Sequence, residues 1–172
     1  MNARRIWSRL LILAGGIAMV VGAINPVGGA LVILLGSGLF ALGTFLGQSE
    51  RSLIAYRVGV FVLIAIGVVA AWSLTAVGGF GGNSGRSMWW GVLILPILIG
   101  WSMGIWGPGS PRWLLVVGIV IGLWYLALLA ITLRFPGRGT GALPGIVLGT
   151  TGLLTIGGCI IRLRKRISTQ PR

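Results

Sequence analysis

Reactive side chains are scarce in this chain of 172 residues. The sequence has no histidine, one acidic residue, Glu50, and one cysteine, Cys159. Acid–base catalysis needs a His, Asp, Glu, Lys, Tyr or Cys placed against a substrate, and a serine–histidine–aspartate triad needs histidine. A single cysteine can neither form an internal disulfide nor supply the set of ligands that a metal site needs. We therefore expect neither an enzyme nor a bound metal ion or cofactor.

The glycine-rich segment 78–87 carries the side chains best suited to an anion. Backbone N–H groups of such a segment can bind an anion, and Arg86 adds a positive charge close to Asn83. Arg134 and Arg138 fall in or beside another polar segment, which we expect on the same face. We predict a contact for an anionic headgroup or solute at Asn83, Arg86, Arg134 and Arg138. A solvated connection with separate arginines is the alternative.

Pro96 stands near the centre of an apolar run, between Gly91 and Gly100. Proline lacks an N–H, so a carbonyl of the preceding turn must find a partner in a neighbour or in water. These three residues are the candidate hinge or solute path. A static kink, which membrane helices tolerate, is the alternative.

Glycine occurs 31 times, often four residues from another small residue. Small residues at this spacing let helices approach closely in lipid, where no hydrophobic force draws them together. The stripes that we single out for helix packing contain Ala18, Gly22, Gly118, Gly122, Gly145 and Gly149. Packing within one chain is the simpler explanation, and packing against partner helices is the other.

The composition favours a protein surrounded by lipid. Hydrophobic residues make up 56% of the chain and charged residues 9%, whereas soluble domains contain roughly 45–50% apolar and about 25% charged residues. Six apolar runs are separated by short polar segments, and each run is long enough, at about 1.5 Å per residue, to cover most of a ~30 Å hydrocarbon core. The predicted spans are residues 8–24, 30–46, 53–77, 88–106, 112–133 and 143–161.

These runs predict an all-α fold, with residues 1–172 forming a single domain, a transmembrane bundle of six spans arranged as three helical hairpins. The hairpins resemble one another, and either a threefold internal repeat or the limited composition of lipid-facing helices explains that similarity. Of the 14 basic residues, Arg86, Arg134 and Arg138 fall on one side of the predicted membrane and the remaining eleven on the other. Because cytoplasmic loops carry an excess of Lys and Arg, both termini are predicted in the cytoplasm, with the protein in a plasma or inner membrane.

Tryptophan prefers the headgroup level of a bilayer, so its position tests the predicted boundaries. Five tryptophans fall at predicted span ends: Trp7, Trp89, Trp90, Trp106 and Trp113. Trp72, Trp101 and Trp124 fall deeper, and we expect these three to pack inside the bundle.

The net charge of +13 has two explanations, nucleic acid or membrane lipid. The basic residues lie in short clusters between apolar runs, so we expect lipid with anionic headgroups as a partner and no nucleic acid. The cluster at Arg162, Arg164, Lys165 and Arg166 is explained by orientation and anchoring. Proton-coupled carriers hold ionisable residues near the membrane midplane, whereas each charge here can extend to a span end.

Function is predicted by exclusion. The leading prediction is a non-catalytic subunit or accessory protein that packs against other membrane chains or against a second copy. The alternative is a small channel or carrier for a neutral or apolar solute, with the fourth span lining its path.

Overall fold

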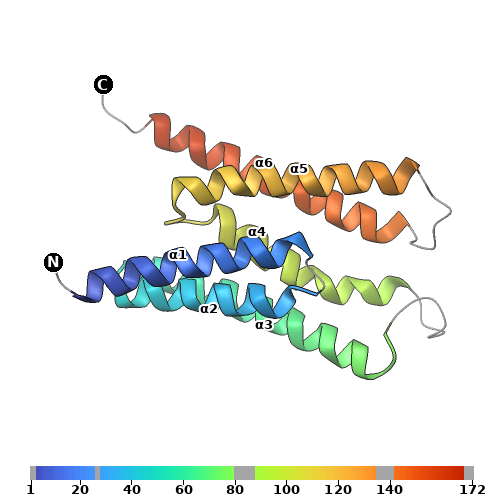
Figure 1. Cartoon of the computed structure of the whole chain (residues 1–172), viewed down its shortest axis with the longest axis horizontal. Helices are drawn as coiled ribbons and strands as arrows, with labels where there is room; N and C mark the ends of the chain where they lie inside the picture. Colours follow the sequence, from blue (N-terminus) through green and yellow to red (C-terminus); the bar gives the residue numbers. More distant parts are fainter. Residues whose placement is uncertain (1–2, 26–27, 80–87, 135–141, 169–172) are drawn as a thin grey trace.

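The computed structural model describes residues 3–25, 28–79, 88–134 and 142–168. Within these ranges all regular secondary structure is helical and no strand occurs, which confirms the predicted all-α class. The elements are α1 (Ala3–Ile24), α2 (Ala30–Leu46), α3 (Arg51–Ala76), the 3-10 helix η2 (Met88–Ile94), α4 (Leu95–Trp106), α5 (Arg112–Arg134) and α6 (Ala142–Ser168) (Figure 1).

Helix ends coincide with residues that cannot continue a helix. After α3, Gly78 and Gly79 have φ angles of 96° and 76°, which favour glycine, and their N–H groups bond to the carbonyls of Thr75 and Leu74. Pro96 stands in the first turn of α4, where its missing N–H removes no helical hydrogen bond.

Four α-helices are long and apolar enough to cross a membrane: α1, α3, α5 and α6. The helix α2, with 17 residues, and the apolar stretch Trp90–Trp106 are shorter. Large apolar side chains cover the outside of the bundle, including Leu35 (68% exposed), Val69 (64%) and Leu154 (65%). Exposing such a surface to water costs free energy, whereas exposing it to hydrocarbon does not. These lengths and this surface are those of a membrane protein.

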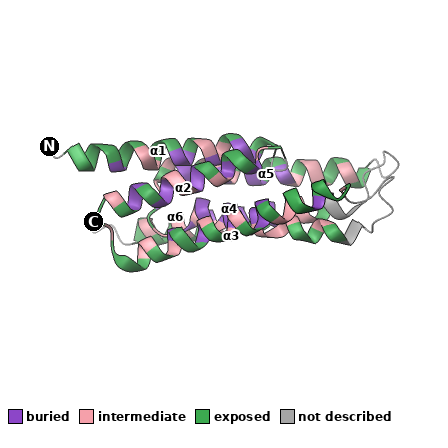
Figure 2. Cartoon of the chain, turned by 90° about the horizontal axis from the view of Figure 1, so that it is seen from below, coloured by how far each residue is buried: buried purple, intermediate pink, exposed green. Residues whose placement is uncertain are grey.

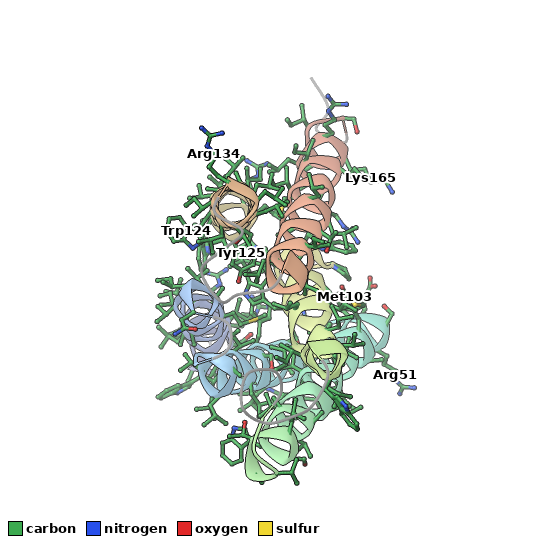
Figure 3. All side chains as sticks on the ribbon, turned by 90° about the vertical axis from the view of Figure 1, so that its right-hand side faces the viewer. Arg51, Met103, Trp124, Tyr125, Arg134 and Lys165 are labelled. Carbon is green, nitrogen blue, oxygen red and sulfur yellow. The ribbon has the colours of Figure 1, made fainter. Side chains whose placement is uncertain are left out.

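The helices run side by side along the long axis of the molecule, and α4 lies at the centre (Figures 1 and 3). The most extensive contacts join α1 to α2 and α5 to α6, while α3 packs against both α2 and α4. The central α4 also contacts α5 and α6. The start of α1 and the end of α6 lie at the same end of the bundle, together with the connections α2–α3 and α4–α5 (Figure 1).

Buried residues follow the middle of the bundle (Figure 2). The largest fully buried side chains are Trp101, Tyr125 and Phe40. The rings of Trp101 and Tyr125 are tilted by 50°, with centroids 5.8 Å apart, a favourable aromatic arrangement. Burial of Trp101 confirms its expected role in packing. The same expectation is wrong for Trp72 and Trp124, which are 60% and 51% exposed because they lie on the outer faces of α3 and α5.

Candidate functional site

Arg57 is a buried positive charge on α3. Its side chain is only 2% exposed. One terminal nitrogen donates to the Gly104 carbonyl at 2.7 Å, and the other donates to the Pro108 carbonyl at 2.7 Å and to the Ser110 hydroxyl at 2.9 Å. The guanidinium carbon lies 4.1 Å from the centroid of the Phe40 ring on α2, within cation–π range. Arg57 therefore joins α2 and α3 to the end of α4 and to the connection that follows.

The position of Arg57 follows from the chemistry of a helix end. The last four carbonyls of a helix have no partner within it, and cations are favoured there. In α4 the Met103 carbonyl accepts a 2.8 Å hydrogen bond from the Tyr56 hydroxyl, and the Gly104 carbonyl accepts from Arg57. Pro108, just beyond the helix, has no N–H to offer. Two consecutive residues of α3 thus bond to the C-terminal turn of α4.

Ser110 receives hydrogen bonds from two arginines. Its hydroxyl accepts from Arg57, and its carbonyl accepts a 2.6 Å bond from a terminal nitrogen of Arg166 in the last turns of α6. Ser110 itself is 1% exposed, and its hydroxyl lies 3.3 Å from the Gly104 carbonyl. We call Tyr56, Arg57, Gly104, Pro108 and Ser110 the Arg57 cluster. Through Arg166 this cluster also holds α6.

This cluster was not predicted from the sequence. Every charge was expected to extend to a span end, and this is wrong for Arg57, which bonds to buried carbonyls instead. Its Nε atom is buried without a hydrogen-bond partner. A signal existed, because Arg57 is the only charged residue in the predicted span 53–77. Its partners could not be identified from the sequence, since they lie 47 to 53 positions further along the chain.

A second set of polar contacts joins α1 to the helices around it. The Trp101 indole donates to the Met19 carbonyl at 2.9 Å, and the Tyr125 hydroxyl donates to the Ala23 carbonyl at 2.8 Å. These two carbonyls are one turn apart on α1. The buried hydroxyl of Ser102 on α4 also pairs with a hydroxyl on α6, that of Thr155, at 2.9 Å. Each of these side chains thus has a protein partner.

The small residues predicted for helix packing lie at contacts between helices of the same chain. A methyl group added at Gly22 would lie 2.9 Å from the Gly29 carbonyl oxygen, and one added at Gly122 would lie 2.9 Å from that of Gly152. Comparable contacts join Ala18 to Gly36, Gly118 to Ile105, Gly145 to Thr132 and Gly149 to Leu129. At these positions α1 packs closely against α2, α4 against α5, and α5 against α6.

The three residues of the candidate hinge or path lie along one continuous stretch, η2 and the first half of α4. Gly91 belongs to η2, and Pro96 stands at the start of α4. Gly100 faces α3, where a methyl group on it would lie 2.6 Å from a side-chain carbon of Ile64. The sequence predicts a bend at Pro96, and the structure has a change there from 3-10 to α-helix.

Of the candidate anion contact, only Arg134 falls within the described residues. It is the last residue of α5 and is exposed. Asn83, Arg86 and Arg138 lie outside the described residues, so the predicted meeting of the four stays a prediction.

An open recess of about 380 Å³ borders the Arg57 cluster. It is lined by Glu50, Ser52, Leu53, Tyr56, Pro108 and Gly109. The only acidic side chain of the sequence, Glu50, thus lies here, at an exposed position. Among the described residues no three His, Cys, Asp or Glu side chains gather as metal ligands, and Cys159 is buried. The hydrogen bonds of the Arg57 cluster can hold α3, α4 and α6 together.

Comparison with known proteins adds no relative. No protein-family model matches the chain, and neither the curated proteins nor the solved structures contain a match.

Proposed function

We propose that this chain is a multi-pass protein of the cell membrane, inserted by six spans in three hairpins with both termini in the cytoplasm. The four long apolar helices support this proposal, as does the placement of the start of α1 and the end of α6 at one end of the bundle. The shorter α2 and the stretch Trp90–Trp106 supply the other two spans. Both can be shorter because other helices of the chain flank them on several sides.

Within that membrane the chain acts as a non-catalytic subunit or accessory protein that packs against another membrane chain or a second copy. One observation carries this proposal. Ala55 and Gly59, four residues apart on α3, are both exposed, and a methyl group added at Gly59 would have nothing within 4 Å. Glycines in the other small-residue stripes contact helices of the same chain. The surface formed by Ala55 and Gly59 is therefore available to a helix of another chain.

Purification in mild detergent followed by native mass measurement tests the proposal. We expect a mass above that of one chain, from a second copy or from a copurifying membrane protein. Gly59→Leu should remove the partner without disturbing the bundle, because open space surrounds this glycine. Gly157→Leu is the matched control, because it makes the same change on α6 at a glycine whose added methyl group would also meet nothing within 4 Å. A lone monomer under all mild conditions would contradict the proposal.

One observation favours the alternative, a small channel or carrier for a neutral or apolar solute. The fourth span changes from 3-10 to α-helix between Ile94 and Leu95, where the central α4 begins. Carriers commonly use such interrupted helices to line a path. Cysteine labelling along residues 91–104 tests it: a water-accessible face is expected, and protection of every position would rule the path out. In the static structure Ile97, Trp101 and Ile105 fill this region.

A further inference from the structure

Two helix ends project from the same end of the bundle. In α1 the residues 3–7 are all exposed, and in α6 the last turns expose residues 164, 165, 167 and 168. Figure 1 places both ends at the same end of the bundle, with α1 beginning on its lower side and α6 ending on its upper side, and Figure 2 shows the first turns of α1 as largely exposed. Both helices continue past the predicted spans, since α1 begins at Ala3 rather than at residue 8 and α6 ends at Ser168 rather than at residue 161.

These projecting turns carry half of the basic residues of the chain. They are Arg4, Arg5 and Arg9 on α1 with Arg162, Arg164, Lys165 and Arg166 on α6, and we call these seven residues the basic end. Neither helix contains an acidic residue, because the only one in the sequence is Glu50. Both helices of the basic end therefore contribute only positive charge.

Exposed apolar side chains lie among these cations. Trp7 is 62% exposed and Ile167 is 73% exposed, and Ile6 and Ile161 are exposed as well. Exposed isoleucine side chains would not stabilise the binding of a free anion or of a nucleic acid backbone. The boundary between headgroups and acyl chains suits both groups at once, because phosphates bind the cations while the upper acyl chain surrounds the apolar side chains.

The α6 part of the basic end is held in place. Arg166 donates to the carbonyl of Ser110, and Ser110 is held in turn by Arg57. Ordering a loose tail would reduce its affinity for a ligand, whereas this helix end is ordered before any ligand arrives.

We infer that the basic end is a docking surface for the phosphate groups of anionic phospholipids in the leaflet that it faces. This inference rests on the proposed insertion into a membrane. It deepens that proposal by assigning the lipid contact to the terminal turns of α1 and α6, at the end of the bundle opposite the end of α3.

Reconstitution of the full chain into nanodiscs tests the inference. Discs of phosphatidylcholine are compared with discs that also contain phosphatidylglycerol, and the selectivity for phosphatidylglycerol is measured by native mass spectrometry and by the shift in melting temperature. The test variant is Arg4→Gln with Arg5→Gln and Arg164→Gln. The control is Arg4→Lys with Arg5→Lys and Arg164→Lys, which keeps the positive charge at the same three positions.

We expect the wild type and the control to select phosphatidylglycerol, and the test variant to lose selectivity on the order of 100-fold, at about 1 kcal/mol per basic residue. Added salt should weaken the selectivity of the wild type, because it screens exposed charges. Equal selectivity in the test variant and the wild type would overturn the inference, as would an equal loss in the control. Selectivity of the wild type that does not respond to salt would also overturn it.

Two competitors separate lipid from other anions. Inorganic phosphate and a short single-stranded RNA should leave the bound phosphatidylglycerol in place, because neither uses the exposed apolar side chains. Displacement by either one would overturn the assignment to lipid. A chain that inserts into discs without preferring phosphatidylglycerol contradicts the docking surface alone, whereas a chain that does not insert contradicts the proposed membrane location as well.

Discussion

A terminal nitrogen of Arg57 lies 2.9 Å from the hydroxyl oxygen of Ser110, which is 53 positions further along the chain. The carbonyl of the same serine accepts from Arg166. One buried residue of the α4–α5 connection is thus bonded to both α3 and α6. Because proline and glycine dominate residues 107–111, this connection has few hydrogen bonds of its own, and the arginines fix its position.

Replacement of Arg57 by methionine should destabilise the bundle by about 3 kcal/mol, because a buried acceptor left without a donor costs about 1–3 kcal/mol. Methionine keeps much of the apolar stem and removes the donors to Gly104, Pro108 and Ser110. Unfolding in mixed micelles with increasing denaturing detergent measures the change. Arg51→Met, at an exposed position of the same helix, is the control and should change stability little. Equal stability of the two variants would show that Arg57 does not hold the connection.

Ser110→Ala should have a smaller effect, about 1 kcal/mol, because it removes the hydroxyl and leaves the carbonyl that accepts from Arg166. The double variant with Arg57→Met should lose less than the sum of the two single changes, since both remove the same hydrogen bond. The same unfolding assay gives the coupling. Ser73→Ala, on an exposed face of α3, serves as the control. Strict additivity would mean that the 2.9 Å contact contributes nothing.

Gly36→Ala should destabilise the contact between α1 and α2 by about 1–3 kcal/mol through overpacking. The added methyl would lie 2.8 Å from the carbonyl oxygen of Gly15 and 2.8 Å from the amide nitrogen of Met19, and backbone atoms cannot rotate away. Gly157→Ala is the matched control, because nothing lies within 4 Å of its added methyl group and alanine favours a helix by roughly 0.5–1 kcal/mol over glycine. Thermal unfolding in detergent measures both. A stable Gly36→Ala variant would contradict the close approach.

Hydropathy located the helices well where apolar residues define both ends. The predicted span 30–46 coincides with α2, and the span 53–77 differs from α3 by two residues at one end and one at the other. The terminal helices extend beyond the predicted spans, because hydropathy detects where apolar sequence stops, whereas arginine and lysine readily continue a helix past that point. The fourth run was predicted as one helix, and its division into η2 and α4 depends on backbone geometry before Pro96 that an apolar pattern does not encode.

The direction in which side chains face was harder to predict than the helices. A lipid-facing helix is apolar on all sides, so the pattern could not distinguish Trp101, which is buried, from Trp72, which is exposed. Arg57 was missed for a related reason. The cost of burying its charge is reduced by carbonyls of α4 that are distant in the sequence, and only the packing of α3 against α4 brings them together.

Tyr125→Phe should destabilise the bundle by roughly 0.5–1.5 kcal/mol, the usual contribution of one hydrogen bond. The change keeps the ring against Trp101 and removes only the hydroxyl that donates to the Ala23 carbonyl. We expect the high end of this range, because Ala23 and Tyr125 are both fully buried and the carbonyl would be left without this donor. Figure 3 shows Tyr125 on the side of α5 that faces the bundle and Trp124 on the outside. Trp124→Phe, next to it and 51% exposed, is therefore the control, and a larger loss of stability there than in Tyr125→Phe would contradict the packing of α5 against α1.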